Sequence, residues 1–458
     1  MNWERKKEEK TMRRKVTRRD FMKGAAVIAA SGLLAGCSGG EGPAAPDNSE
    51  QPGTSEKPAE SNSNSSSSSE SESTSSSKPE ETNGIKWTYS KNSDGTITLK
   101  GYDKNAEKVP SGELIIPEKY DGYTVSKIGY MCLYQNNDIE SIVIPATIKM
   151  IDQQAFYQCK NLTNVVFPEG LKELGQSSFN GCNIENLVLP ESLTKAGKQV
   201  FANNIALENA LIKGKTEFMQ NTFENCTNLT TVIFQNTIRT LPSFMFQNCE
   251  RLLNVQFPTN VKTLGSYIFR GCKLLSDITI PATITEIGGS AFNNCASLRA
   301  IVIPKGVTEI SSGTFYGCET LSEVSIPESV KTIGSSAFTN CTSLTRIKLP
   351  MQMTKIESGT FSQCTSLRKI ALSEGLASIE SSTFWKCVSL QEIYIPATVK
   401  TVGTSAFYAC KSLNKVYFGG SEELWKQVVI ADDYEHGNKY LTTDIMNRYW
   451  NQTAASII

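Results

Sequence analysis

Cysteine is the residue type in this sequence with the clearest capacity for chemistry. The chain contains 13 cysteines, and eleven of them recur at the constant interval that separates Cys159 from Cys182, except for one longer step to Cys226. Thiols spaced in this way can form disulfides, bind a metal ion or pack as small apolar side chains. The eleven are Cys159, Cys182, Cys226, Cys249, Cys272, Cys295, Cys318, Cys341, Cys364, Cys387 and Cys410.

The spacing argues against disulfides and against metal sites. In stacked repeats the Cβ atoms of neighbouring cysteines stay about 4.8 Å apart, whereas a disulfide brings them to about 3.8 Å. Metal sites usually include a CxxC or a His pair, yet no two cysteines lie closer in sequence than Cys159 and Cys182, and His436 is the only histidine. We therefore expect free thiols that pack as buried apolar wedges, with no metal and no cofactor.

Motifs of catalytic sites are missing from the sequence. It has no GxSxG, no P-loop, no GxGxxG behind a strand and no HExxH, and its one histidine leaves no dyad. The acidic pairs Asp432-Asp433 and Glu422-Glu423 lie in a polar C-terminal stretch, where adjacent carboxylates usually form a solvated face. We therefore expect a protein that is not an enzyme.

The formal charge of zero is a sum over three different segments. Residues 1–23 carry ten Lys/Arg and four Asp/Glu, residues 38–83 carry two and nine, and residues 84–458 carry 34 and 33. Because the part that can fold is almost neutral, we expect no broad basic face for nucleic acid.

The N-terminal segment has the pattern of an export signal. Arg18, Arg19, Phe21 and Lys23 resemble the twin-arginine motif, which implies export of an already folded protein. The apolar run over 24–35 that follows is about twelve residues long, whereas a membrane span needs roughly 20.

A lipid anchor is expected directly after this signal. Leu34-Ala35-Gly36-Cys37 resembles a bacterial lipobox, in which the cysteine becomes the lipidated first residue of the mature chain. We expect residues 1–36 to be the signal peptide and Cys37 to be held at a membrane by acyl chains. A plain signal peptide that is cleaved elsewhere is the alternative.

Residues 37–83 are predicted to be a disordered tether. They are mostly Ser, Glu, Pro, Gly, Asn and Thr, with twelve serines between Ser61 and Ser77. Such a composition buries too little apolar surface to offset the entropy of ordering. A flexible chain of about 46 residues spans roughly 35–40 Å, enough to lift a folded body off a lipid surface.

A 23-residue repeat occupies most of the remaining chain. In one unit, Ile301 and Ile303 alternate with period two, which predicts a short strand, and Pro304 ends that strand because it lacks an N–H donor. One coil cannot bury its own apolar side chains. Stacking about thirteen coils with parallel strands gives a mainly β solenoid roughly 60 Å long. Further inward residues of this unit are Val307, Ile310, Phe315, Cys318 and Leu321.

The long step between Cys182 and Cys226 conceals one further coil. Phe201 precedes Asn204 by three positions, as Phe179 precedes Cys182, so asparagine stands there in the cysteine position. An earlier coil has Asn136 at the same place. We infer that a local hydrogen bond can replace thiol packing at this turn.

The repeat resembles that of the BspA-like leucine-rich repeat surface proteins. Their repeats read close to LxxIxIPxxVxxIGxxAFxxCxx, and residues 321–341 of this chain read LSEVSIPESVKTIGSSAFTNC. The resemblance covers about residues 84–458. It implies a leucine-rich repeat solenoid in a protein that is presented at the bacterial cell surface.

Caps are expected at both ends of the solenoid. We expect an N-terminal cap and first coil over 84–128, the solenoid over 129–421 and a C-terminal cap over 422–458. The first cap is predicted to contain a β-hairpin around Asp94-Gly95. The second is predicted to be helical, because Leu424, Trp425 and Val428 have helical spacing.

The side chains between the inward strand residues change character along the chain. The first five are aliphatic, and later coils bring basic and aromatic residues. Exposed apolar runs and Tyr/Arg clusters are typical of interfaces, although β-branched residues also simply suit a strand. The candidate binding face comprises Val143, Val166, Val188, Leu211, Ile233, Arg346, Lys348, Lys369, Tyr394 and Tyr417.

The resemblance also carries an expectation about function. BspA-like proteins are associated with adhesion to host extracellular-matrix proteins and with contacts between bacterial cells. We expect a cell-surface lipoprotein that recognises protein ligands, contacts the membrane through its lipid anchor only and binds no nucleic acid. A carbohydrate- or cell-wall-binding module is the alternative. Evenly spaced exposed aromatic residues would favour it, and Tyr394 and Tyr417 are the candidates.

Overall fold

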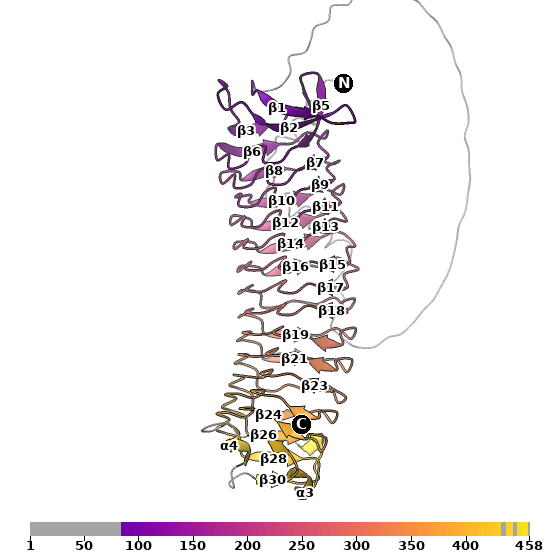
Figure 1. The fold of residues 1–458 in the computed structure, drawn as a ribbon, viewed down its shortest axis with the longest axis vertical. Helices are drawn as coiled ribbons and strands as arrows, with labels where there is room; N and C mark the ends of the chain where they lie inside the picture. The colour runs from indigo at the N-terminus through magenta and orange to yellow at the C-terminus, as the bar shows by residue number, and fades with distance from the viewer. Residues whose placement is uncertain (1–83, 432–436, 443–446, 457–458) are drawn as a thin grey trace, which may run out of the picture.

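The computed structural model describes residues 84–431, 437–442 and 447–456. These residues stack into a rod, with the first strands at one end and the C-terminal elements at the other (Figure 1). About thirteen coils of about 23 residues make up the rod, which confirms the predicted solenoid. The expected signal peptide 1–36 and tether 37–83 lie outside the described residues.

Strands of three to five residues line one side of the rod, here called the long-strand column. Neighbouring strands pair in parallel and in register, so that Asn209 lies opposite Thr231. The pairing is interrupted, and in the described residues the column consists of four separate sheets. The strands are β3 (Gly112–Ile115), β6 (Ile139–Val143), β8 (Asn164–Val166), β10 (Asn186–Leu189), β12 (Asn209–Ile212), β14 (Thr231–Phe234), β16 (Asn254–Gln256), β19 (Ala300–Val302), β21 (Glu323–Ser325), β24 (Lys369–Ala371), β26 (Glu392–Ile395), β28 (Lys415–Phe418) and β30 (Asn447–Tyr449).

A second set of parallel strands, the short-strand column, was not predicted from the sequence. Two residues are too few to show a period, so Val307 and Ile310 could be assigned inward positions but not a strand. The column continues from β5 (Tyr123–Ile128) through strands of two residues. These are β7 (Met150–Ile151), β9 (Glu173–Leu174), β11 (Lys195–Ala196), β13 (Glu217–Phe218), β15 (Thr240–Leu241), β17 (Thr263–Leu264), β18 (Glu286–Ile287), β20 (Glu309–Ile310), β22 (Thr332–Ile333), β23 (Lys355–Ile356), β25 (Ser378–Ile379), β27 (Thr401–Val402) and β29 (Val429–Ile430).

A double turn around a phenylalanine completes each coil. Ser290 and Asn294 flank Phe292 with φ angles of 54° and 58°. The next coil has Gly313 and Gly317 at these two positions, with φ of 64° and 72°. Left-handed backbone at both places reverses the chain twice within a few residues and directs the phenylalanine inward.

These phenylalanines form the central column of the core. Ring centroids of successive coils lie 5.0–5.8 Å apart with the rings nearly parallel. Identical side chains in register bury one another most completely, and each of these rings is at most 1% exposed. They are Phe156, Phe179, Phe201, Phe223, Phe246, Phe269, Phe292, Phe315, Phe338, Phe361, Phe384 and Phe407.

The ends of the rod depart from the repeat. At the N-terminal end, β1 (Trp87–Lys91) and β2 (Ile97–Tyr102) pair antiparallel, as β4 (Lys119–Tyr120) does with β5. At the C-terminal end the helical segments are short, and the ring of Trp425 packs on Phe418 with a centroid distance of 5.1 Å. These segments are α3 (Glu422–Trp425), α4 (Lys439–Thr442) and the 3-10 helix Ala454–Ser456.

Candidate functional site

The outward side chains of the long-strand column form a face that runs along the rod. In β19, Ile301 points into the core and is 3% exposed, whereas its neighbour Val302 is 67% exposed. Because side chains alternate across a strand, the residues on either side of each inward isoleucine or valine make up this outer face. This outer face contains the residues of the candidate binding face predicted from the sequence.

The first part of the outer face is aliphatic. Val188, Leu211 and Ile233 lie opposite one another in β10, β12 and β14 and pack into a small cluster that is separate from the main core. Val143 and Val166 precede them in β6 and β8 and are half-buried.

The expectation of an exposed aliphatic run is wrong for the centre of this cluster. Leu211 is 2% exposed and Ile233 is 7% exposed. Both point outward as predicted, but at the close spacing of paired strands the outward side chains cover one another. The cluster therefore offers a partner much less apolar surface than the sequence indicates.

Further along, the outer face becomes basic. Arg346 and Lys348 are exposed, and neither makes an ion pair with a residue that the structure describes. Arg346 lies beside Lys369 in a parallel bridge, so two cations are adjacent on neighbouring coils. Like charges placed opposite each other destabilise a sheet.

Arg368 adds a further cation that the sequence reasoning missed. It is exposed, directly precedes Lys369 and makes no ion pair among the described residues. The sequence did contain a signal for it, because Arg368 directly precedes the candidate residue Lys369. We call Arg346, Lys348 and Arg368 the basic zone.

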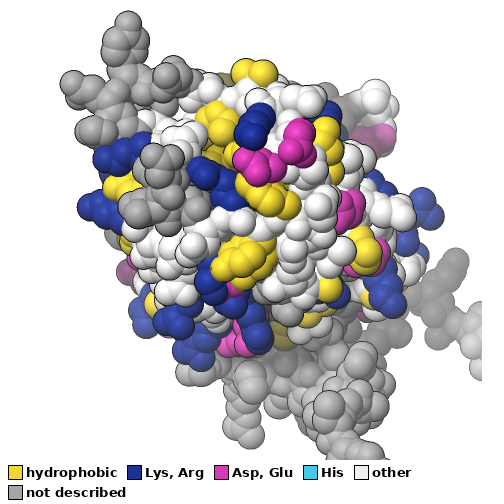
Figure 2. Space-filling view, turned by 90° about the horizontal axis from the view of Figure 1, so that it is seen from below, with side chains coloured by type: hydrophobic (Ala, Val, Ile, Leu, Met, Phe, Trp, Pro, Cys, Tyr) yellow, Lys and Arg dark blue, Asp and Glu magenta, His cyan; other side chains and the backbone are white. Residues whose placement is uncertain are grey.

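Figure 2 looks onto the C-terminal end of the rod and shows Lys and Arg side chains at several places around the rim, with hydrophobic side chains scattered among them.

Lys369 differs from the basic zone because its charge is neutralised. The ammonium nitrogens of Lys369 and Lys415 each lie 3.2 Å from a carboxylate oxygen of Glu392. Burial raises the pKa of Glu392, but the hydrogen bonds from the two lysines outweigh it and hold this pKa below its ordinary value. At the outward positions of the long-strand column, Arg346 and Lys348 of the basic zone are therefore the cations without an ion pair among the described residues.

Tyr394 does not present the exposed ring that the sequence predicted. It is 1% exposed, and its hydroxyl donates to a Glu374 carboxylate oxygen at 2.5 Å. Burial and this hydrogen bond raise the pKa of Tyr394. The 3-10 helix Ala454–Ser456 lies close to β26, the strand that carries Tyr394. Tyr417 is half-buried and stacks on Tyr449 with a centroid distance of 4.9 Å.

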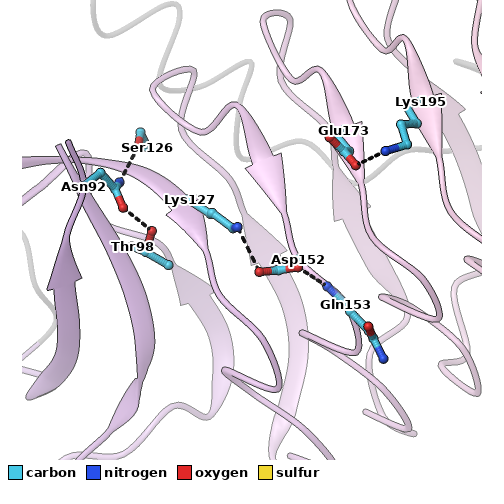
Figure 3. A network of polar contacts seen from close by, with 8 residues as sticks. All are labelled: Asn92, Thr98, Ser126, Lys127, Asp152, Gln153, Glu173 and Lys195. Atoms are coloured by element: carbon cyan, nitrogen blue, oxygen red, sulfur yellow. Dashed lines mark hydrogen bonds and ion pairs between the residues drawn. The ribbon is translucent and has the colours of Figure 1, made fainter. Parts of the chain in front are cut away.

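Polar contacts in the N-terminal part of the rod follow a different pattern. The Lys127 ammonium lies 2.9 Å from a carboxylate oxygen of Asp152, and Lys195 lies 2.8 Å from Glu173 (Figure 3). These pairs join successive coils of the short-strand column through opposite charges. Each is partly exposed and contributes modestly to stability. Arg346 and Lys369 instead place two cations at adjacent outward positions of the long-strand column, and together with its position on the outer face this makes the basic zone our candidate site.

The predicted cysteine ladder lies inside the rod. Its eleven thiols are free and fully buried, and each Sγ donates to a backbone carbonyl of the preceding coil at 3.0–3.3 Å. Cys295, for example, donates to the carbonyl of Phe269. Burial raises the pKa of these thiols, to about 12 for Cys318. They are therefore protonated at neutral pH and unsuited to nucleophilic chemistry.

Asparagine replaces cysteine by making the same contact. Asn204 is fully buried, and its side-chain amide donates to the carbonyls of Phe179 at 2.8 Å and Phe201 at 2.9 Å. Asn136 donates to the Pro110 carbonyl at 3.1 Å. Each coil thus places a side-chain donor at this turn, which is why either residue type fits there.

Three aromatic pairs beside the phenylalanine column were also missed by the sequence reasoning. The signal was an aromatic residue two positions before or one position after the inward phenylalanine, or after Leu133 in the first coil, in two successive coils. Arg270 lies over the ring of Tyr267 and Lys386 over that of Trp385, whereas Tyr134 is 36% exposed. The pairs are Tyr134–Tyr157, Phe244–Tyr267 and Trp385–Tyr408, with centroid distances of 5.2, 4.9 and 6.0 Å.

Other expected sites fall outside the described residues or have no counterpart within them. Cys37, the twin-arginine residues and His436 lie outside them. In the part of the chain that the structure describes, no group of three or more His, Cys, Asp and Glu side chains is arranged to hold a metal ion. Within the same residues, no helix has the length and hydrophobicity needed to cross a bilayer.

Comparison with known proteins places the repeat in a family. The model of the BspA type leucine rich repeat region matches residues 126–222, 213–322 and 290–414, more than half of the chain. A leucine-rich repeat protein from Bacteroides ovatus is 24% identical over 80% of this chain and 98% of its own, with a TM-score of 0.55, and shares the fold.

Two further solved structures are similar at a lower TM-score. A leucine rich cell surface protein from Faecalibacterium prausnitzii is 26% identical over 76% of this chain and 97% of its own, with a TM-score of 0.45. The pneumococcal vaccine antigen PcpA is 17% identical over 81% and 98%, with a TM-score of 0.48. No curated protein matches the chain significantly.

Proposed function

The chain belongs to the BspA-type leucine-rich repeat family, and from this premise we propose that it is a non-enzymatic cell-surface protein that recognises protein ligands. The outer face of the long-strand column is the recognition surface, and the basic zone is its main contact. Twin-arginine export and lipidation of Cys37 belong to the same proposal, since they would present the rod outside the cytoplasm.

The observation that carries this proposal is the unneutralised charge of Arg346, Lys348 and Arg368. On the same face, the nearby Lys369 and Lys415 both pair with Glu392, whereas these three cations have no ion pair among the described residues. Arg346 also lies opposite Lys369, and like charges opposite each other disfavour strand pairing in the isolated rod. An acidic surface on a partner would neutralise them, and arginine is enriched among the residues that dominate binding energy.

The structure does not favour the carbohydrate-binding alternative. That alternative relied on exposed rings at Tyr394 and Tyr417, but the first is buried and the second stacks on Tyr449. In two of the three aromatic pairs beside the phenylalanine column, a cation lies over one ring, that of Tyr267 or Trp385. Sugar rings stack on free aromatic faces, so protein recognition has the stronger support.

The test is a charge reversal in the full chain. Arg346→Glu combined with Lys348→Glu is compared with the parent for binding to immobilised extracellular-matrix proteins and to an array of isolated glycans. We expect at least a tenfold loss of binding to matrix protein, since each lost charge contact costs about 1–3 kcal/mol. Binding by the parent protein should also weaken as salt concentration rises.

A matched control reverses two exposed cations on another side of the rod. Arg239→Glu combined with Lys262→Glu makes the same change in net charge beside the short-strand column. This control should bind as the parent does, and both variants should unfold at similar urea concentrations. Equal binding by the parent and the Arg346/Lys348 variant would refute the basic zone, and binding to glycans alone would refute protein recognition.

A further inference from the structure

The buried thiols have no part in the proposed recognition surface, yet they constrain how the rod can form. Every ladder cysteine is fully buried and uses its S–H to satisfy a carbonyl of the coil before it. Cys132, which stands off the ladder, is also free and 4% exposed. The folded rod thus holds twelve thiols away from solvent.

The stacked coils leave no place for a disulfide between neighbouring ladder cysteines. Coils stacked in register hold equivalent Cβ atoms near the strand spacing of about 4.8 Å, about 1 Å more than the usual Cβ separation in a disulfide. Forming the bond would also turn two sulfur atoms, such as those of Cys272 and Cys295, away from the carbonyls of Phe246 and Phe269. Because the phenylalanine column is close-packed, the coils cannot shift to accommodate this.

The unfolded chain has no such protection. Its thiols are exposed and ionise near their ordinary pKa, so they react with disulfide oxidants. Two protein thiols and one oxidised glutathione give one protein disulfide and two reduced glutathiones, with the two electrons and two protons passing to the glutathione sulfurs. Neighbouring ladder cysteines, such as Cys272 and Cys295, are only one repeat apart in the sequence, a distance over which chain closure costs little.

We infer that the cysteine ladder makes folding of this rod conditional on a reducing environment: the coils must stack before the thiols meet an oxidant, and once stacked they protect those thiols. This inference rests on the proposed location outside the cytoplasm. It also gives the twin-arginine signal a physical purpose, because that route, as implied by the resemblance of Arg18 and Arg19, carries a protein that has already folded.

The experiment uses the full chain with Cys37→Ser, so that only the twelve described cysteines remain. The protein is unfolded in urea and diluted into buffer that contains either reduced or oxidised glutathione. Folding is followed by circular dichroism, and free thiols are counted with a small maleimide in the folded protein and again in urea. A third sample stays folded throughout its exposure to oxidised glutathione.

The three samples distinguish the effect of the oxidant on refolding from its effect on the thiols of the folded protein. Refolding with reduced glutathione should recover the native signal, with thiols that react slowly until urea is added. Refolding with oxidised glutathione should lose most of the native fraction, and later addition of dithiothreitol should restore it. The sample that was never unfolded should keep all twelve thiols.

Two outcomes would overturn the inference. One is recovery of native protein with intact disulfides under oxidising conditions, and the other is rapid oxidation of thiols in the folded protein. Rescue by dithiothreitol distinguishes disulfide trapping from a general failure to refold. Neither outcome involves Arg346 or Lys348, so this test and that of the recognition surface fail independently.

Discussion

The inward and outward residues of the same coils follow opposite rules. Inward, each coil repeats one chemistry: a stacked phenylalanine and, three positions later, a buried donor that is cysteine or asparagine. Outward, the side chains differ from coil to coil: they form the aliphatic cluster around Leu211 in one part of the rod and include the cations Arg346 and Lys348 in another. Stacking fixes the first set, because any change disturbs two neighbouring coils. The second set is free to vary, and recognition can be encoded there.

Removal of one stacked ring should have the largest effect. Phe269→Ala leaves a cavity between the rings of Phe246 and Phe292, and we expect the free energy of unfolding to fall by about 3–5 kcal/mol. Gln256→Ala, at an exposed outward position of β16, should change it by no more than about 0.5 kcal/mol. Urea unfolding followed by circular dichroism measures both, and equal losses would contradict the distinction between the two sets.

Loss of a ladder donor should have the next largest effect. Asn204→Ala removes the hydrogen bonds to the carbonyls of Phe179 and Phe201, and we expect a loss of about 2–3 kcal/mol. Asn204→Cys should recover about half of this, because a thiol at this turn donates to the preceding coil, as Cys182 does. If the free energy of unfolding in urea falls equally in both variants, a side-chain hydrogen-bond donor is not what stabilises position 204.

Alkaline pH should destabilise the inward set specifically. In the folded rod burial raises the thiol pKa, to about 12 for Cys318, whereas the unfolded thiol titrates near 9.0. Stability is therefore fully present below about pH 9 and falls as pH rises from there toward 12, because the unfolded state releases protons that the folded state retains. Each buried thiol contributes about 1.4 kcal/mol per pH unit in this range.

The variant Cys318→Ala tests this assignment. It should be less stable than the parent at pH 7, but its stability should fall less steeply above pH 9, by the contribution of one thiol. Lysine and tyrosine titrations are common to both proteins and cancel in the difference. The free energy of unfolding of both proteins is measured in urea between pH 9 and 10.5. If it falls with the same slope in both, this thiol is not protected.

The outward cations should have the smallest effect on stability. Arg346→Ser removes a charge that lies beside Lys369, so we expect a change within about 0.5 kcal/mol, toward higher stability. Glu392→Gln, in contrast, leaves Lys369 and Lys415 without their shared partner and should cost about 1 kcal/mol, less at high salt. A clear loss of stability from Arg346→Ser would mean that this arginine supports the fold instead of a partner.

The sequence was informative wherever one coil repeats the next. The spacing of Phe292 and Cys295 recurs often enough to predict the solenoid, the parallel strands and the buried free thiols. The two-residue strand at Glu309–Ile310 could not be predicted, because its hydrogen bonds join different coils and leave no period within one. Left-handed turns were equally hidden, since Ser290 and Gly313 adopt them at equivalent positions.

What the sequence determined by itself is therefore the repeat and the direction in which each side chain points, because period and alternation are properties of the chain alone. Only the tertiary structure decided which outward residues remain accessible. Leu211 is covered by its neighbours in adjacent strands, and Tyr394 is buried with its hydroxyl hydrogen-bonded to Glu374. It also decided which charges are neutralised, since Glu392 reaches Lys369 and Lys415 but nothing reaches Arg346 among the described residues. Exposure and ion pairing depend on what lies one coil away or folds back from the chain end, and the local sequence of a single coil does not specify either.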